Sequence, residues 1–283
     1  MSIFLKAKKS GSIPAMTFFA ILFTLFSILG TVYISIGSGN PVNKVTHNLW
    51  SSAKFRTDAG NYFVSKALET ATGDERKLLL DKGLAISATV SSFLANPIFH
   101  LEADQLSNVV YNYYASGSTS KKTVDIKPIV NLGLLGLESV DPEFSRLKKE
   151  LEKIKPIKLQ PQTNGPNVTN VKSTLTLVTV LLLIFSLLSL FLYALFARSL
   201  KSFLRKVGIT IFITGILLIV IDIVATALVN HQASSVIESL ARKAIPIAAH
   251  PLLAPFFTFG ILEVLIGLVL ALPSFLKRMD VSS

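Results

Sequence analysis

The sequence predicts an all-α integral membrane protein with four transmembrane helices and one extracytoplasmic helical domain. Half of the chain is hydrophobic (51% of 283 residues), and these residues gather in four apolar segments. Each segment has about the 20 residues that a helix needs to cross a hydrocarbon layer. Because lipid offers no hydrogen-bond partners to the backbone, such segments must be helical. Basic residues flank the segments, which is typical of membrane topology signals.

The clearest pattern is a hairpin of two apolar segments. Residues 173–197 carry no charge, and residues 207–229 are apolar apart from one aspartate. The connection between them, residues 198–206, has no acidic residue and four basic ones: Arg198, Lys201, Arg205 and Lys206. Basic connections are retained on the cytoplasmic side. These four residues therefore predict a cytoplasmic turn and determine the topology.

The other two spans follow from the same pattern. The first has an apolar stretch that is long for a signal peptide, which favours a retained signal-anchor over a cleaved segment. Its small residues Ser27 and Gly30 favour close contact between helices. Pro251 and Pro255 open the last span. The predicted order is cytoplasmic N-terminus 1–14, span 15–38, extracytoplasmic domain 39–172, span 173–197, cytoplasmic turn 198–206, span 207–229, extracytoplasmic amphipathic segment 230–250, span 251–273 and cytoplasmic C-terminus 274–283.

The domain between the first two spans shows helical patterns. Apolar residues recur at spacings of three and four over Thr46–Thr72 and after Asn96-Pro97, where Asn can cap the helix and Pro can occupy its first turn. A further helix is expected after Asp141-Pro142-Glu143, followed by a Pro- and Asn-rich linker. Val124–Ile126 can be a short extended piece. No alternation predicts a sheet, so the domain is expected to be all-helical.

Two stretches resemble a known group of proteins. Val124–Ile129, with the helix and polar loop before it, and Arg198–Val220 are similar to uncharacterised bacterial four-pass integral membrane proteins. In that group a large extracytoplasmic helical domain lies between the first two spans. The resemblance implies the same architecture for this chain. It implies no activity, cofactor or site residue.

Charge and cysteine content exclude several classes of function. The net charge of +11 could indicate nucleic-acid binding, but nine of the 28 Lys and Arg residues flank the membrane segments. We therefore expect no nucleic-acid partner. The chain has no cysteine, which excludes disulfides, thiolate metal sites and cysteine nucleophiles.

Two carboxylates inside apolar spans are the candidate intramembrane polar site. Asp222 and Glu263 each stand in an apolar run, where a charged side chain costs about 2.5–3.5 kcal/mol. Counted from the outer ends of their spans at ~1.5 Å per residue, both are expected at similar depth. They could form a proton or cation site, or contact a basic residue of a partner. Alternatively, each is a protonated acid that bonds to a hydroxyl of the second span, which supplies Ser186, Ser189 and Tyr193.

No other residues form a recognisable site. His100 and Asp104 lie one helical turn apart, but they are an incomplete ligand set for a metal, and a solvated helix surface is the simpler interpretation. The aromatic residues Tyr111, Tyr113 and Tyr114 are expected to belong mainly to a core. Motifs for nucleophiles, phosphate or dinucleotides are absent from the sequence, so we expect no enzyme activity, no metal and no cofactor.

The sequence therefore predicts a non-enzymatic protein of the plasma membrane, with both termini inside. Its extracytoplasmic domain would bind another protein, an envelope component or a second copy of the chain. The alternative is a small transporter, channel subunit or lipid-handling protein that uses the intramembrane carboxylates. Internal repeats, which are common in transporters, are not visible in the sequence.

Overall fold

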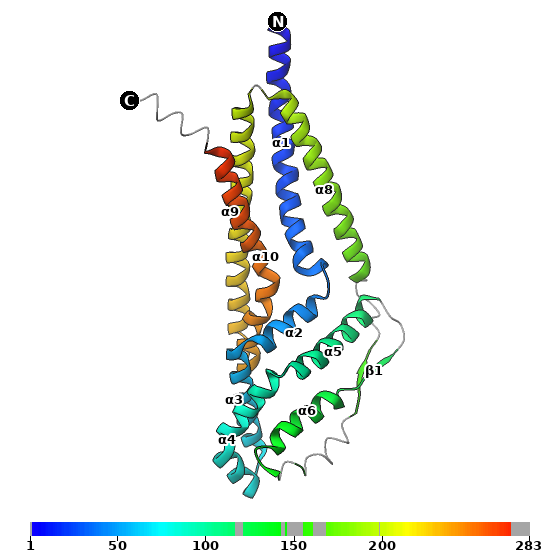
Figure 1. The fold of residues 1–283 in the computed structure, drawn as a ribbon, viewed down its shortest axis with the longest axis vertical. Helices are drawn as coiled ribbons and strands as arrows, with labels where there is room; N and C mark the ends of the chain where they lie inside the picture. The colour runs from blue at the N-terminus through cyan, green and yellow to red at the C-terminus, as the bar shows by residue number, and fades with distance from the viewer. Residues whose placement is uncertain are drawn as a thin grey trace, which may run out of the picture. The chain divides into compact units, whose positions relative to one another are not determined.

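A computed structural model describes residues 2–116, 121–142, 145, 155–160, 168–197 and 199–272 of the chain. It is almost entirely helical (Figure 1). The elements in chain order are α1 (Ser2–Val32), the π-helical turn η1 (Tyr33–Gly37), α2 (Pro41–Ser51), α3 (Ala53–Thr70), α4 (Gly73–Leu94), α5 (Pro97–Ala115), β1 (Lys122–Val124), α6 (Lys127–Glu138), β2 (Ile157–Leu159), α8 (Val168–Phe196), α9 (Leu200–Ser234) and α10 (Ser239–Ala271).

The chain forms two compact units. Unit 1 comprises Met1–Gly39, Val171–Ala227 and Leu253–Ser283, and unit 2 comprises Asn40–Asn170 and Leu228–Leu252. The predicted domain therefore corresponds to most of unit 2, which also takes in the end of α9 and the start of α10.

Unit 1 contains the apolar segments. Among the described residues, four helices are long and apolar enough to cross a membrane, Ile13–Gly37, Asn170–Phe196, Leu200–Ser234 and Ser239–Ala271. Each of the four predicted spans thus corresponds to a helix of spanning length and composition. The bent pair α4 and α5 meets the same criterion only when both helices are taken together. In unit 1 the starts of α1 and α9 and the ends of α8 and α10 lie at the same end (Figure 1), so the four helices alternate in direction.

Glycines bring α9 and α10 into backbone contact. A Cβ atom on Gly208 would lie 2.7 Å from the carbonyl oxygen of Gly267, and one on Gly215 would lie 2.6 Å from that of Gly260. Both distances are too short for any side chain. The two glycines on each helix are seven residues apart, or about two turns, so they repeat on one face of an antiparallel helix pair.

The last span differs from the prediction. Residues 230–250 were expected to be separate from it, but α10 runs without a break from Ser239 through Pro251 and Pro255. A proline inside a helix leaves the carbonyl four residues earlier without its donor. For Pro251 this is the carbonyl of Ile247, and the side-chain amide of Asn48 donates to it at 2.5 Å. The side chain of α2 thus replaces the lost helical hydrogen bond.

The helices of unit 2 begin at side-chain caps. Asn96 accepts from the Ile98 amide at 2.8 Å, and Pro97 follows at the first helical position, as predicted. The predicted helix over Thr46–Thr72 is interrupted at Ser52, which caps α3 by accepting from the Phe55 amide at 3.3 Å. Ile86 of α4 is fully buried among apolar residues of α3 and α4.

Unit 2 also contains a small sheet, so the expectation of an all-helical domain was wrong. Strands β1 and β2 pair antiparallel, with Val124 opposite Ile157 and Lys122 opposite Leu159. Val124 and Leu159 are buried against Tyr113 of α5. Most of the helix predicted after Asp141-Pro142-Glu143 lies outside the described residues.

Candidate functional site

The carboxyl group of Glu263 lies in the interior of unit 1. Its Cβ is 2.9 Å from the position that a Cβ on Gly215 would occupy, so Glu263 is at the level of the α9–α10 contact. Its side chain faces the hydroxyl of Ser27 on α1. Yet Glu263 Oε2 and Ser27 Oγ are both buried without a hydrogen-bond partner among the described residues. The pair is therefore close, but not in the geometry of a formed hydrogen bond.

Asp222 is not part of the same site. It lies on α9 seven residues beyond Gly215, which is two turns or about 10 Å along the helix axis. Glu263 is level with Gly215 itself. The expectation that the two carboxylates have matching depth was therefore wrong. The register set by the paired glycines places them two turns apart.

Hydroxyl groups surround the level of Glu263. Thr24 of α1 and Thr214 of α9 share a hydrogen bond of 3.0 Å between their hydroxyls, and Thr214 is fully buried. Thr31 donates to the Ser27 carbonyl at 2.7 Å. Thr179 of α8 packs against Gly30, and its hydroxyl is buried without a partner among the described residues. Hydroxyls of the first span thus contribute most of this polar interior, whereas the partner hydroxyls were expected on the second span.

The basic residues of the predicted turn lie at the start of α9. Lys201, Arg205 and Lys206 occupy its first two turns, and Arg198 lies outside the described residues. The ammonium of Lys206 is 6.0 Å from the ring centre of Tyr193, within reach of a cation–π contact. Tyr193 is itself buried with Phe19, at a level of unit 1 different from that of Glu263.

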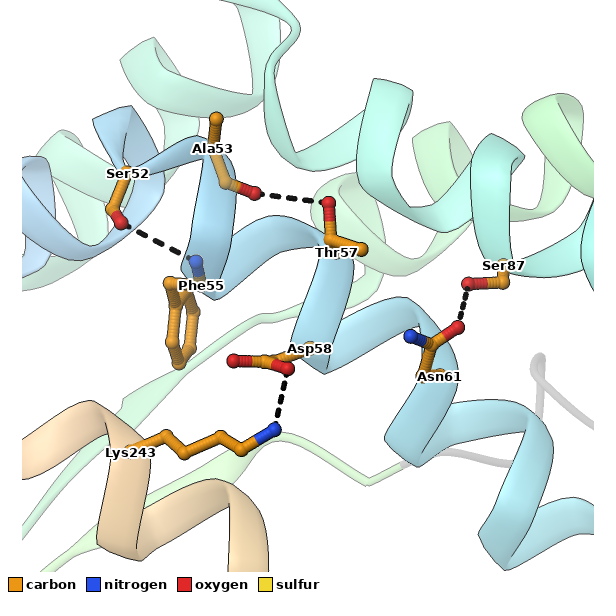
Figure 2. Close-up of polar contacts among 8 residues, drawn as sticks. All are labelled: Ser52, Ala53, Phe55, Thr57, Asp58, Asn61, Ser87 and Lys243. Carbon is orange, nitrogen blue, oxygen red and sulfur yellow. Dashed lines mark hydrogen bonds and ion pairs between the residues drawn. The ribbon is translucent and has the colours of Figure 1, made fainter.

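A second polar cluster lies in unit 2, between α3 and the start of α10. Figure 2 shows Lys243 of α10 reaching Asp58 of α3, with Nζ and Oδ1 2.5 Å apart. On the next turn of α3, Asn61 accepts a hydrogen bond of 2.7 Å from Ser87 (Figure 2), and Tyr62 donates to Glu238. A cleft of about 220 Å³ lies beside these residues. No local pattern predicts this cluster, since its two sides are about 180 residues apart in the chain.

Two of the remaining candidates, His100 and Tyr113, bond to backbone carbonyls within unit 2. His100 bonds through Nε2 to the Leu94 carbonyl at 2.8 Å. No group of three metal-ligating side chains occurs in the part of the chain that the structure describes. Tyr113 is buried and donates to the Leu159 carbonyl at 3.3 Å. Burial, with a smaller effect of the neighbouring Tyr114, raises the pKa of Tyr113 above its ordinary value.

Unit 2 has an open groove between α4 and α6, with a volume of about 540 Å³. Small residues line much of it and let the two helices approach, with Gly136 against Thr89 and Gly133 against Phe93. Leu135 stands at its edge with 63% of its surface exposed. One helical turn before the groove-lining Ala88, Leu84 of α4 is 89% exposed.

These features define a class of protein. Four helices of spanning length and composition make this a multi-pass helical membrane protein. Comparison with known proteins identifies no relative: no family model, curated protein or solved structure matches the chain.

Proposed function

We propose that this is a non-enzymatic protein of the plasma membrane whose unit 2, outside the cytoplasm, binds a partner protein through the groove between α4 and α6. The exposure of large apolar side chains at this groove carries the proposal. Contiguous apolar surface on the aqueous part of a protein is typical of a binding site. Leu80, Leu84 and Ala88 follow one another at spacings of four on α4 and lead into the groove.

The shape of the groove favours a helical segment as the occupant. Small side chains of its floor, including Ala88, Ser92 and Gly136, leave room for an incoming backbone. The exposed Leu84 and Leu135 could contact apolar residues at every third or fourth position of that segment. This is the way amphipathic helices bind in grooves. A second copy of the chain is the other possible source of such a helix.

The orientation rests on the charges at the start of α9. A cation near the N-terminus of a helix is unfavourable for the helix dipole, yet Lys201, Arg205 and Lys206 lie there. Helix stability therefore does not explain them, whereas retention on the cytoplasmic side does. Because the helices of unit 1 alternate in direction, this orientation puts the opposite end of unit 1, where residues 39 and 171 lie, outside.

Single-cysteine labelling tests the orientation, because the chain has no cysteine of its own. Cysteine at the exposed Ser116 should react with an impermeant maleimide in intact cells. Cysteine at the exposed Lys201 should react only after lysis. The opposite pattern would overturn the orientation and the extracytoplasmic placement of unit 2.

A photocrosslinking amino acid at Leu135 tests the groove. It should give a discrete adduct in native membranes, and the same substitution at Leu101 of α5, which is 58% exposed, should not. Leu84→Glu should abolish the adduct at Leu135. Mass spectrometry then distinguishes a different protein from a second copy. Equal crosslinking at both positions would contradict a specific groove.

The alternative, a transport or lipid-handling role, was predicted to use Asp222 and Glu263 together. The separation of about two turns along α9 gives no support to a shared site. Glu263 alone retains the properties that such a role requires, because its carboxyl is in the interior of unit 1 and has an unpartnered oxygen.

A further inference from the structure

Three buried side-chain atoms in the described part of unit 1 lack a hydrogen-bond partner: Ser27 Oγ, Thr179 Oγ1 and Glu263 Oε2, of which the first and last face one another. Buried polar side-chain atoms are nearly always hydrogen-bonded. Ser27 is only 5% exposed. Other hydroxyls of α1 are already used: Thr24 bonds to Thr214, and Thr31 bonds to the Ser27 carbonyl. The Ser27 hydroxyl is therefore available to bond to Glu263.

Among the side chains that the structure describes, no cation forms an ion pair with Glu263 Oε2. Besides Glu263, the ionisable groups among the side chains that the structure describes in unit 1 are Tyr33 of η1, Lys172 and Tyr193 of α8, and Lys201, Arg205, Lys206 and Asp222 of α9. None of them bonds to Glu263 Oε2 in the part of the chain that the structure describes. At the level of Glu263 lie the Ser27 hydroxyl, the bonded hydroxyls of Thr24 and Thr214, and the backbone of Gly215. Ser27 therefore offers a hydroxyl partner to a protonated carboxyl group.

We propose that Glu263 and Ser27 form a proton-binding site within the membrane-spanning unit. With the proton bound, the carboxyl O–H donates to Ser27 Oγ and these two atoms are satisfied. When the proton leaves to water, the Ser27 O–H must turn to donate to the carboxylate, and a negative charge remains against the close contact of α9 and α10. Proton uptake and release therefore act on the contact among α1, α9 and α10.

The proposal is independent of partner binding by unit 2 and has its own probe. Dicyclohexylcarbodiimide enters bilayers, adds to a protonated carboxylic acid and leaves a stable acylurea. The full-length protein, in vesicles of phosphatidylethanolamine and phosphatidylglycerol, would be treated over a range of pH and the adducts located by mass spectrometry. We expect the adduct at Glu263 to fall as pH rises, and to exceed the adduct at Asp222 several-fold at neutral pH.

Variants identify the partner hydroxyl. Glu263→Gln should abolish the adduct. Ser27→Ala should shift the pH midpoint of labelling, whereas Ser189→Ala, which removes a hydroxyl of the second span, should leave it unchanged. If Glu263→Gln failed to fold, the adduct map of the unaltered protein would still decide the matter. No adduct at Glu263, labelling that does not depend on pH, or equal effects of the two serine variants would overturn the proposal.

Discussion

The α9–α10 contact of unit 1 and the α3–α4 contact of unit 2 hold helices together by different means. In unit 1 the contact is made by glycines on both helices, Gly208 and Gly215 against Gly267 and Gly260. In unit 2 a single glycine, Gly60, lies against the backbone of Ser87, and next to it an apolar cluster includes the fully buried Ile86.

The difference reflects the two solvents. Removing a large apolar side chain from water stabilises a fold by about 1.5–3 kcal/mol. Burial of this kind stabilises the α3–α4 contact of unit 2. Lipid tails are as apolar as leucine, so the same burial contributes little between membrane helices. There, close approach of backbones and polar contacts between helices hold the bundle together. Glycines and hydroxyls are accordingly concentrated where α1, α9 and α10 meet.

The sharpest way to break the unit 1 contact is Gly215→Ala. The added Cβ would lie 2.6 Å from the Gly260 carbonyl oxygen, so the helices must move apart. We expect a loss of about 1–3 kcal/mol or more, as for overpacked cores. Gly30→Ala is the matched control, since its Cβ would meet nothing closer than 3.8 Å. That change should be neutral or stabilise α1 by about 0.5–1 kcal/mol.

Unfolding in mixed micelles of dodecylmaltoside and dodecyl sulfate measures both variants. Opposite signs would confirm that the glycines of α9 and α10, and not small residues in general, set the packing of unit 1. If the two variants were equally destabilised, the backbone contact would not be the decisive feature.

A smaller loss of stability is expected from the hydrogen bond that Asn48 makes beside Pro251 of α10. Asn48→Ala removes the donor to the Ile247 carbonyl and should destabilise unit 2 by about 1 kcal/mol. Adding Pro251→Ala should restore most of this loss, because an alanine at 251 supplies the backbone N–H that bonds to residue 247. Pro255→Ala in the same background should not, since its N–H would reach the carbonyl of Pro251 instead.

The only tryptophan of the chain, Trp50, lies two residues from Asn48 and reports this change by fluorescence. Denaturant unfolding of the single and double variants gives the coupling free energy directly. Zero coupling between Asn48 and Pro251 would mean that the side-chain amide does not replace the helical hydrogen bond.

What the sequence predicts well is what depends on local composition. The four spans, the basic start of α9 and the Asn96-Pro97 cap are properties of short segments, because the solvation of each segment by lipid or water is decided locally. The pairing of Val124 with Ile157 depends on residues far apart in the chain, and no local pattern shows it.

The candidate site shows the same limit. Glu263 is visible in the sequence as a charge in an apolar run, but its neighbour could be identified only from the arrangement of helices. The hydroxyl was expected on the second span, but in the structure it is Ser27 of the first span that faces Glu263. One signal was available and overlooked: glycines seven residues apart occur in both of the last two spans. Their spacing gives the α9–α10 register, and with it the separation of Asp222 from Glu263.

The smallest expected effect concerns pH and belongs to unit 2 alone. Burial raises the pKa of Tyr113 above its ordinary value, which is about 10. The folded protein therefore keeps the phenolic proton at a pH where the unfolded chain has lost it. The contribution of Tyr113 to the free energy of unfolding is fully present below the ordinary tyrosine pKa. It is lost as the pH rises through the higher pKa of the folded state.

Denaturant unfolding followed by Trp50 fluorescence at pH 8 to 11 should show unit 2 weakening over the alkaline part of the range. Tyr113→Phe removes the titrating group together with its hydrogen bond to Leu159. This variant should be less stable than the unaltered protein below the tyrosine pKa, because it lacks the hydrogen bond, and should lose less stability above it. Tyr111→Phe is the matched control on the same helix and should keep the pH dependence. If Tyr113→Phe kept it as well, the buried phenol would not be its source.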